Sequence, residues 1–127
     1  MYPALNEISI TQATPTTDTL AKCEQLLDYV SWHPNATIRF HASDMILYTD
    51  SDMVYLVLPR ARSRLAGYFF LGPDPTKLPV TTSNGLLTEC KNIRHAVSSV
   101  AEAETAALFH NTQTACLICY ILQYVRR

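Results

Sequence analysis

The longest uninterrupted apolar run in the chain extends from Ala115 to Leu122. A helix that is hydrophobic on every side must be buried on more than one side. The run is far shorter than the roughly 20 residues that a membrane-spanning helix needs. Because 48% of the 127 residues are hydrophobic and only 17% are charged, the chain can form a real core. We therefore expect a globular domain in which this run is a helix that needs cover on more than one side.

Charge and glycine content argue against several classes of function. The formal net charge is −1, so no overall positive field attracts a polyanion. Only 3 glycines accompany 7 prolines, which argues against a glycine-rich loop that cradles a phosphate. Residues 1–10 lack a basic flank followed by an apolar core, so no secretory signal is visible. We expect an intracellular protein, in the cytoplasm or nucleus, without a membrane segment.

The 4 cysteines are predicted to be free thiols, because disulfides are rare in reducing compartments. Cys116 and Cys119 form a C-x-x-C pair inside the apolar helical run. No second pair of ligands follows at zinc-site spacing. Cysteine is among the residue types most often buried, so the sequence favours two core cysteines over a metal site.

Two segments are expected before the sheet. Residues 1–16 are polar and contain two prolines, which predicts a flexible N-terminal arm, and residues 17–127 should form a single domain. A helix is predicted to begin near Thr17 or Asp18, either of which can cap it. This helix should end before Pro34, because proline disfavours helical backbone in the residue that precedes it.

The middle of the chain predicts an antiparallel sheet. Asn84-Gly85 is a turn signal, and consecutive strands with short connections pair antiparallel. Residues 73–83 contain three prolines and are predicted as a loop. The expected strands are Thr37–Phe40, Met45–Tyr48, Met53–Leu58, Ala66–Leu71 and Leu86–Cys90.

The last third is predicted to be helical. Ser99 to Glu102 match the capping box, with serine at the cap and glutamate three residues on. This helix should run to about His110, and a second helix should follow over about residues 114–124. The order helix, strands, helix, helix predicts an α/β chain of the α+β kind.

Three acidic residues are candidate metal ligands. Asp50 and Asp52 close an apolar strand, where carboxylates are well placed to bind a metal; the alternative is that they cap a turn. Glu104 falls on an apolar stripe of its predicted helix, where an ionised carboxylate needs a cation or hydrogen bonds. The alternative for Glu104 is an edge position in reach of solvent, whereas the capping box already explains Glu102.

Three arginines are candidate phosphate contacts. Arg60, Arg62 and Arg64 alternate, so in a strand they would share one face and could contact a nucleic-acid backbone. An ordinary solvated strand edge is the other explanation for the same pattern.

Seven short segments form an ordered string of motifs: Ile38–Met45, Ser51-Asp52, Tyr55-Leu56, Ala61–Arg64, Gly67–Gly72, Asn84-Gly85 and Ser98–Glu104. This string resembles the ribonuclease H region of retrotransposon polyproteins, and the closest likeness is to copia-type reverse-transcriptase elements. The likeness covers roughly residues 20 to 125. Its specificity comes from the order of the motifs, because any one of them alone is weak.

The resemblance implies a ribonuclease H-like fold, in which three antiparallel strands precede the helices. It also implies hydrolysis of the RNA strand of RNA–DNA hybrids, with acidic side chains that hold two Mg²⁺ (or Mn²⁺) ions. Asp52 matches the first carboxylate of the family, with Asp50 as the fallback. Glu104 matches the second carboxylate, with Glu102 as the fallback.

The family pattern continues beyond the point where this chain stops. It has a further strand with a third Asp and later elements with a fourth acidic residue, whereas this chain stops at Arg127 and has no Asp after Asp74. The resemblance therefore implies a truncated domain that lacks its C-terminal strands and two acidic ligands. We expect this chain to be inactive as an endonuclease; the alternative is a noncatalytic interaction module, either a transposon relic or a host-adopted fragment.

Self-association is a further expectation. An apolar helix without a complete cover and an open sheet edge are both typical of interfaces. The sequence therefore predicts a homodimer or larger assembly built on the helix around residues 115–122 and on the free edge of the sheet. The alternative is that the N-terminal helix covers the same surface within one chain.

Overall fold

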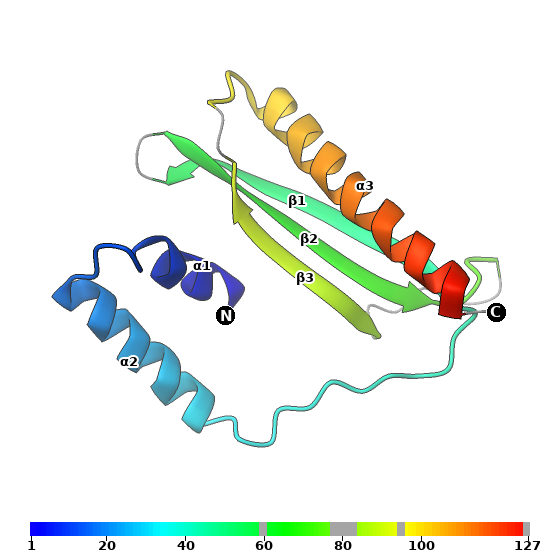
Figure 1. The fold of residues 1–127 in the computed structure, drawn as a ribbon, viewed down its shortest axis with the longest axis horizontal. Helices are drawn as coiled ribbons and strands as arrows, with labels where there is room; N and C mark the ends of the chain where they lie inside the picture. The colour runs from blue at the N-terminus through cyan, green and yellow to red at the C-terminus, as the bar shows by residue number, and fades with distance from the viewer. Residues whose placement is uncertain (59–60, 77–83, 94–95, 126–127) are drawn as a thin grey trace. The chain divides into compact units, whose positions relative to one another are not determined.

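The structure is a computed structural model that describes residues 1–58, 61–76, 84–93 and 96–125 (Figure 1). Two compact units divide the chain, Met1–Thr37 and Ile38–Arg127. The fold is α+β, with two N-terminal helices, a three-stranded antiparallel open sheet and a long C-terminal helix. The elements in chain order are α1 (Tyr2–Ile10), α2 (Thr17–Ser31), β1 (Ile46–Leu58), β2 (Arg62–Gly72), β3 (Gly85–Asn92) and α3 (Val100–Val125). No helix in the described ranges is long and apolar enough to cross a membrane.

The N-terminal unit contains α1 and α2, so a helix occupies most of the segment predicted as a flexible arm. Pro3 lies in the first turn of α1, where proline is tolerated because the amide hydrogen that it lacks has no helical partner there. Thr16 caps α2, and its hydroxyl accepts a hydrogen bond from the amide of Thr19 at 3.3 Å. The compact units divide after Thr37, not after residue 16.

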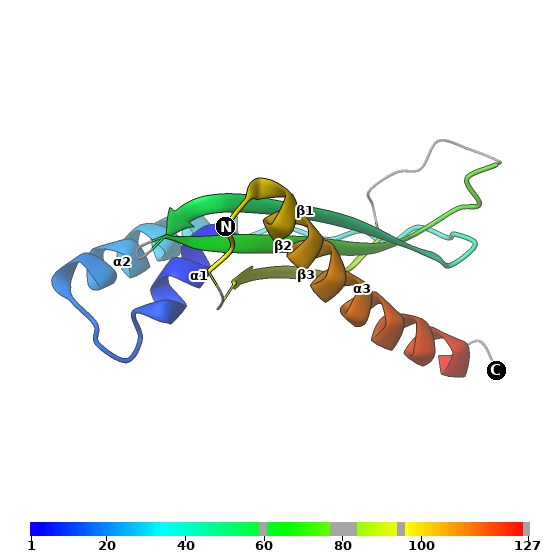
Figure 2. The same cartoon turned by 90° about the horizontal axis from the view of Figure 1, so that it is seen from above.

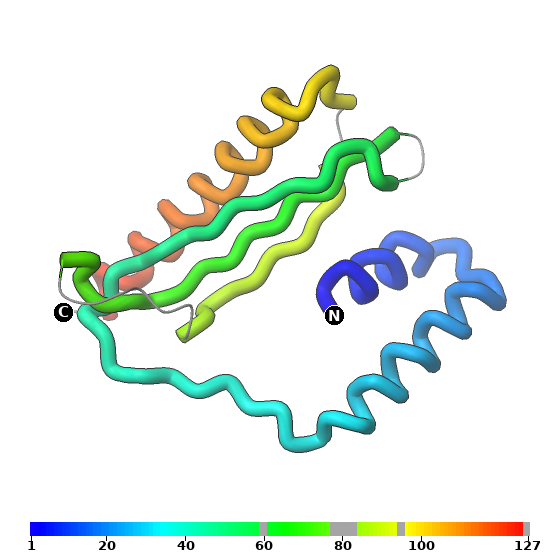
Figure 3. Tube along the Cα trace, turned by 180° about the vertical axis from the view of Figure 1, so that it is seen from behind, coloured from blue at the N-terminus to red at the C-terminus, as the bar shows by residue number. Residues whose placement is uncertain are grey.

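The sheet has the strand order β1-β2-β3, and both neighbouring pairs are antiparallel, as the sequence predicts (Figure 3). β1 pairs with β2 in unbroken register from Ile46 to Val54, and a bulge follows before Leu58. Leu56 in this bulge has a φ of 55°, in the left-handed region. Its amide donates a hydrogen bond to the hydroxyl of the fully buried Ser63 at 3.1 Å, which satisfies a group that the ladder leaves unpaired.

One strand prediction is wrong. Thr37–Phe40 is not a strand, because an extended run needs a partner and the described sheet begins only at Ile46. Met45–Tyr48 and Met53–Leu58 are extended as predicted, and both belong to one strand, β1, which continues through the acidic residues between them. The continuation follows from strand alternation, since Asp50 and Asp52 are both exposed and point to the same face. The predicted loop over residues 73–83 lies largely outside the described residues.

The predicted cap of the C-terminal helix is confirmed. The hydroxyl of Ser99 accepts a hydrogen bond from the amide of Glu102 at 3.1 Å. The carboxylate of Glu102 in turn accepts bonds from the hydroxyl and the amide of Ser98, at 2.6 and 2.7 Å. These two bonds from Ser98, the hydroxyl first, hold the pKa of Glu102 below its usual value.

The helix that follows is one continuous helix, α3, of 26 residues, not the two predicted. The polar residues near the predicted break fit within it. The side chain of Asn111 bonds to the sheet, and the hydroxyl of Thr112 donates to the carbonyl of Leu108 at 2.8 Å. These bonds remove the reason for the helix to end near residue 111.

The core lies between α3 and one face of the sheet, where α3 packs on β1 and β2 (Figure 1). Its buried residues are Met53, Leu65, Ile93, Val97, Ala103 and Ala107. The two alanines are fully buried, and their small side chains let the helix lie close to the strands. One turn further along, Asn111 is also fully buried and donates to the Ser51 hydroxyl at 2.7 Å and to the Ala66 carbonyl at 2.9 Å.

The C-terminal half of α3 is less covered than the first half. Figure 2 shows the helix moving away from the plane of the sheet toward its C-terminus. Leu117 and Ile121 are 68% and 60% exposed, although helical periodicity places them near the side that packs on the sheet earlier in α3. One chain therefore leaves part of the apolar run uncovered.

Candidate functional site

Asp50 and Asp52 lie within β1, on the sheet face opposite α3. Alternation decides this face, because Ser51 bonds to Asn111 of α3 and Met53 belongs to the core beneath α3. Both aspartates are exposed, and one carboxylate oxygen of Asp52 accepts a hydrogen bond from the amide of Met53 at 2.8 Å. They neither end a strand nor cap a turn.

Glu104 is exposed on α3. The apolar stripe that sequence periodicity finds around Glu104 exists, but it faces solvent, since Val100 and Leu108 are 55% and 59% exposed. The side of α3 that packs on the sheet is the one that carries Ala103 and Ala107. Glu104 therefore needs no buried partner, and the alternative of an edge position in reach of solvent fits it.

The two carboxylates that the resemblance pairs do not converge. Asp52 projects from the face of the sheet that α3 leaves uncovered, whereas Glu104 lies on the helix that covers the other face. Its fallback, Glu102, is engaged with Ser98 at the helix cap. In the described part of the chain, no group of three or more His, Cys, Asp or Glu side chains could hold a metal ion.

Arg62 and Arg64 share one face of β2, as their alternation predicts. Arg60 lies outside the described residues. Arg62 is exposed and Arg64 is half-buried, and the buried Ser63 between them points to the other side of β2. This face also carries Asp50 and Asp52, so it presents both signs of charge to an approaching polyanion. A mixed surface attracts phosphates less than a uniformly basic one.

Aromatic side chains stack on the same face of the sheet. Phe70 lies between Tyr48 and Tyr68, with ring centroids 5.4 and 5.3 Å away. The hydroxyl of Tyr48 donates to the carbonyl of Pro73 at 2.8 Å. Because Phe70 is only 3% exposed, this stack is part of the packing and leaves little ring surface for a ligand.

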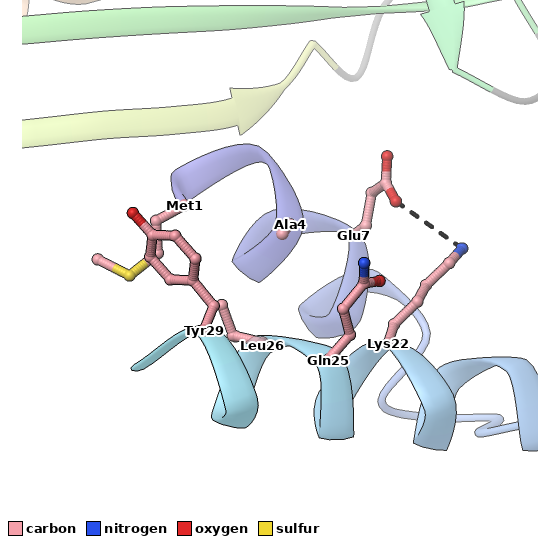
Figure 4. A pocket seen from close by; sticks show the side chains of 7 residues that line it. All are labelled: Met1, Ala4, Glu7, Lys22, Gln25, Leu26 and Tyr29. Carbon is pink, nitrogen blue, oxygen red and sulfur yellow. Dashed lines mark ion pairs between the residues drawn. The ribbon is translucent and has the colours of Figure 1, made fainter. Parts of the chain in front are cut away.

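We consider two cavities of the described structure. One, of about 310 Å³, lies between the segment 40–45 and β2, where the amide group of Asn84 bonds to the backbone of His41 and Leu71. The other, of about 340 Å³, lies between α1 and α2 (Figure 4). There Lys22 pairs with Glu7 at 3.8 Å. Neither cavity brings together the nucleophile, base or acid pair that catalysis requires.

A charged cluster that the sequence did not predict lies between β3 and α3. Glu89 of β3 pairs with Lys91 at 2.9 Å and with the His110 imidazole of α3 at 3.1 Å. The alternation of Glu89 and Lys91 along β3 was the available signal, since it places both on the face that meets α3. The cluster ties the edge strand to the helix, which is a structural role.

Both cysteines of the C-x-x-C pair are exposed, which overturns the prediction that they are core residues. They lie on the outward side of α3, away from Ala107 and Asn111. Cys23 and Cys90 are half-buried on other elements. Helical periodicity identified an apolar run here but not how many of its sides are covered.

The helix α3 carries many exposed apolar side chains. We define the α3 surface by seven of them, each 59–69% exposed: Leu108, Phe109, Leu117, Tyr120, Ile121, Tyr124 and Val125. No Asp, Glu, Lys or Arg occurs between Thr105 and Val125. Exposed apolar side chains gathered on one helix are typical of an interface.

Comparison with protein-family models, with curated proteins and with solved structures found no match.

Proposed function

We propose that this chain is a noncatalytic interaction module that self-associates through the α3 surface. The observation that carries the proposal is the exposure of seven large apolar side chains on one helix, with no charged residue among them. Candidate catalytic groups are scattered over opposite sides of the sheet, so they give the competing enzyme hypothesis little support.

A second copy of the chain suits the α3 surface because that surface carries no charged side chain. A two-fold interface places the same patch against itself, so each charged group in it tends to meet its like. The segment from Thr105 to Val125 has no Asp, Glu, Lys or Arg, and its one histidine, His110, is engaged with Glu89. Two copies can therefore meet along α3 without electrostatic repulsion.

The exposed apolar side chains of the α3 surface can contribute enough free energy to stabilise a dimer. Burying a large apolar side chain completely contributes roughly 1.5–3 kcal/mol. Since the seven side chains are already partly covered, each offers about 1 kcal/mol more, or on the order of 10–15 kcal/mol for two copies. Association costs an estimated 4–15 kcal/mol before any net affinity appears. A dimer of modest affinity is the expected outcome.

We place the main contact on α3 and not on the sheet edge. β1 and β3 are the edges of the described sheet, and each has one strand neighbour. β1 carries a bulge near Leu56 and the exposed Asp50 and Asp52, all of which disfavour edge-to-edge pairing. The edge is then at most a secondary contact.

Descent from a ribonuclease H-like domain is a separate proposal about ancestry. Three antiparallel strands followed by a helix across one face support it, since the resemblance implies that order. The separation of Asp52 from Glu104 does not favour cleavage of RNA–DNA hybrids with Mg²⁺ or Mn²⁺. We expect the chain to leave a labelled hybrid intact in either metal; cleavage that Asp52→Asn abolishes would restore the enzyme hypothesis.

Sedimentation velocity across a dilution series tests the self-association. With EDTA and a reductant present, the mass should fall from dimer toward monomer as the chain is diluted from about 100 to 1 μM. Phe109→Glu and Tyr120→Glu should shift the chain to monomer, because each places a charge against its copy. Val57→Glu on β1 is the matched control, since Val57 is 54% exposed, and should leave the mass unchanged. A monomer at every concentration would refute the proposal.

A further inference from the structure

Two thiols lie side by side on the outward side of α3. Cys116 and Cys119 are exposed and are not joined in a disulfide. Residues three apart on a helix share one side, with Cβ atoms about 5–6 Å apart. Thr112 and Gln123 belong to the same outward side, and both are exposed. The two sulfur atoms are therefore available together to one ligand.

The spacing of these thiols favours a metal ion over an internal disulfide. A disulfide needs Cβ atoms about 3.5–4.5 Å apart, which is closer than an unstrained helix places Cys116 and Cys119. A tetrahedral Zn²⁺ with Zn–S bonds of about 2.3 Å holds its sulfurs about 3.8 Å apart. Side chains whose Cβ atoms are about 5–6 Å apart reach that separation when both sulfurs lean inward. Two cysteines separated by two residues are also the usual half of a four-cysteine zinc site.

No other ligand within the described sheet unit completes such a site. Cys90 pairs in register with Ala66 on the sheet face opposite α3. No set of three or more metal-binding side chains comes together across the residues that the structure describes. One copy of α3 therefore supplies two of the four sulfurs that a closed zinc site needs.

We propose that two copies of the chain bind one Zn²⁺ between their α3 helices, with Cys116 and Cys119 of each copy as ligands. The inference rests on the proposed self-association, because a two-fold axis beside the outward side of α3 sets one cysteine pair against an identical pair. Phe109 and Tyr120 of the α3 surface flank the cysteines on that side and would close around the ion. Binding converts four thiols to thiolates and releases four protons.

Native mass spectrometry and sedimentation with added Zn²⁺ and a non-thiol reductant test the site. We expect one zinc per two chains. With free Zn²⁺ at about 100 times its dissociation constant, the dimer should become about 100-fold tighter by linkage. Co²⁺ in place of Zn²⁺ should give the visible absorption of tetrahedral thiolate coordination. Cys116→Ser and Cys119→Ser should abolish these effects, whereas Cys23→Ser should retain them.

The outcomes separate this inference from the proposed function. A dimer in EDTA that Zn²⁺ does not tighten would overturn the zinc site and leave the α3 interface standing. A monomer in EDTA that Zn²⁺ converts to a dimer would support the zinc site and overturn the claim that apolar contact suffices. Zinc bound at one ion per chain, or retained by the Cys116→Ser and Cys119→Ser variants, would overturn the two-copy site.

Discussion

Replacing Gly67 with alanine perturbs the contact that fixes α3 on the sheet. A Cβ added at this buried position of β2 would lie 2.9 Å from Cγ of Asn111 and 3.0 Å from Cε2 of Phe69. Side chains do not tolerate such distances, so Asn111 must move. It cannot move freely, because it is fully buried and its amide bonds to Ser51 and Ala66.

The size of the effect follows from three contributions to the free energy of unfolding. Overpacking of a core costs about 1–3 kcal/mol. Each weakened hydrogen bond of Asn111 costs a further 0.5–1.5 kcal/mol or so. Alanine regains about 0.5–1 kcal/mol over glycine in a strand, because the unfolded chain is less free. We expect Gly67→Ala to lower the stability by about 2–3 kcal/mol.

Urea unfolding followed by circular dichroism measures this loss, and a double-mutant cycle isolates its cause. Asn111→Ala removes the group that the new methyl would strike. In that background Gly67→Ala should cost less than about 1 kcal/mol, which gives a coupling energy of at least about 1 kcal/mol. Equal losses in both backgrounds would show that the contact between Gly67 and Asn111 is not what limits the packing.

Two further predictions concern stability. Ser63→Ala should lower the free energy of unfolding by about 1–3 kcal/mol, because it leaves the Leu56 amide in the bulge without its acceptor; urea unfolding that matches the parent chain would contradict this role. The Ser98 bonds lower the pKa of Glu102 in the folded state. The stability that Glu102 contributes is therefore present above the pKa of Glu102 in the unfolded chain, and it is lost as the pH falls through the lower pKa of the folded state. Glu102→Gln should therefore make unfolding less sensitive to acid below about pH 5, and an unchanged pH dependence would count against the cap.

Local rules predicted the parts of the fold that local chemistry decides. Ser99 caps α3 and Asn84 adopts a positive φ of 71° before β3, because side-chain bonds and backbone sterics act within a few residues. The alternating residues of β2 and β3 likewise predicted their pairing. The polar composition and the two prolines of residues 1–16 predicted an arm, whereas α1 occupies Tyr2–Ile10, because proline fits the first turn of a helix.

The candidate site was harder to predict, because the faces of α3 are chosen by tertiary packing. The apolar stripe through Glu104 and the cysteine pair both looked buried on a helical wheel. The structure instead buries the side with Ala103 and Ala107, where small side chains permit close approach, and exposes larger ones. Periodicity shows that a helix has an apolar side but cannot say which of two such sides meets the sheet.

The most direct test of the central claim is a measurement of contacts between copies. In a sample that mixes isotope-labelled and unlabelled chains, isotope-filtered NMR detects only nuclei that approach across an interface. The α3 surface should give intermolecular contacts between the rings of Phe109 and Tyr120 in one copy and those of the same residues in the other. An assembly whose only intermolecular contacts involve the edges of β1 or β3, or a sample with none at concentrations of about 1 mM, would contradict the account, since 1 mM detects even weak dimers.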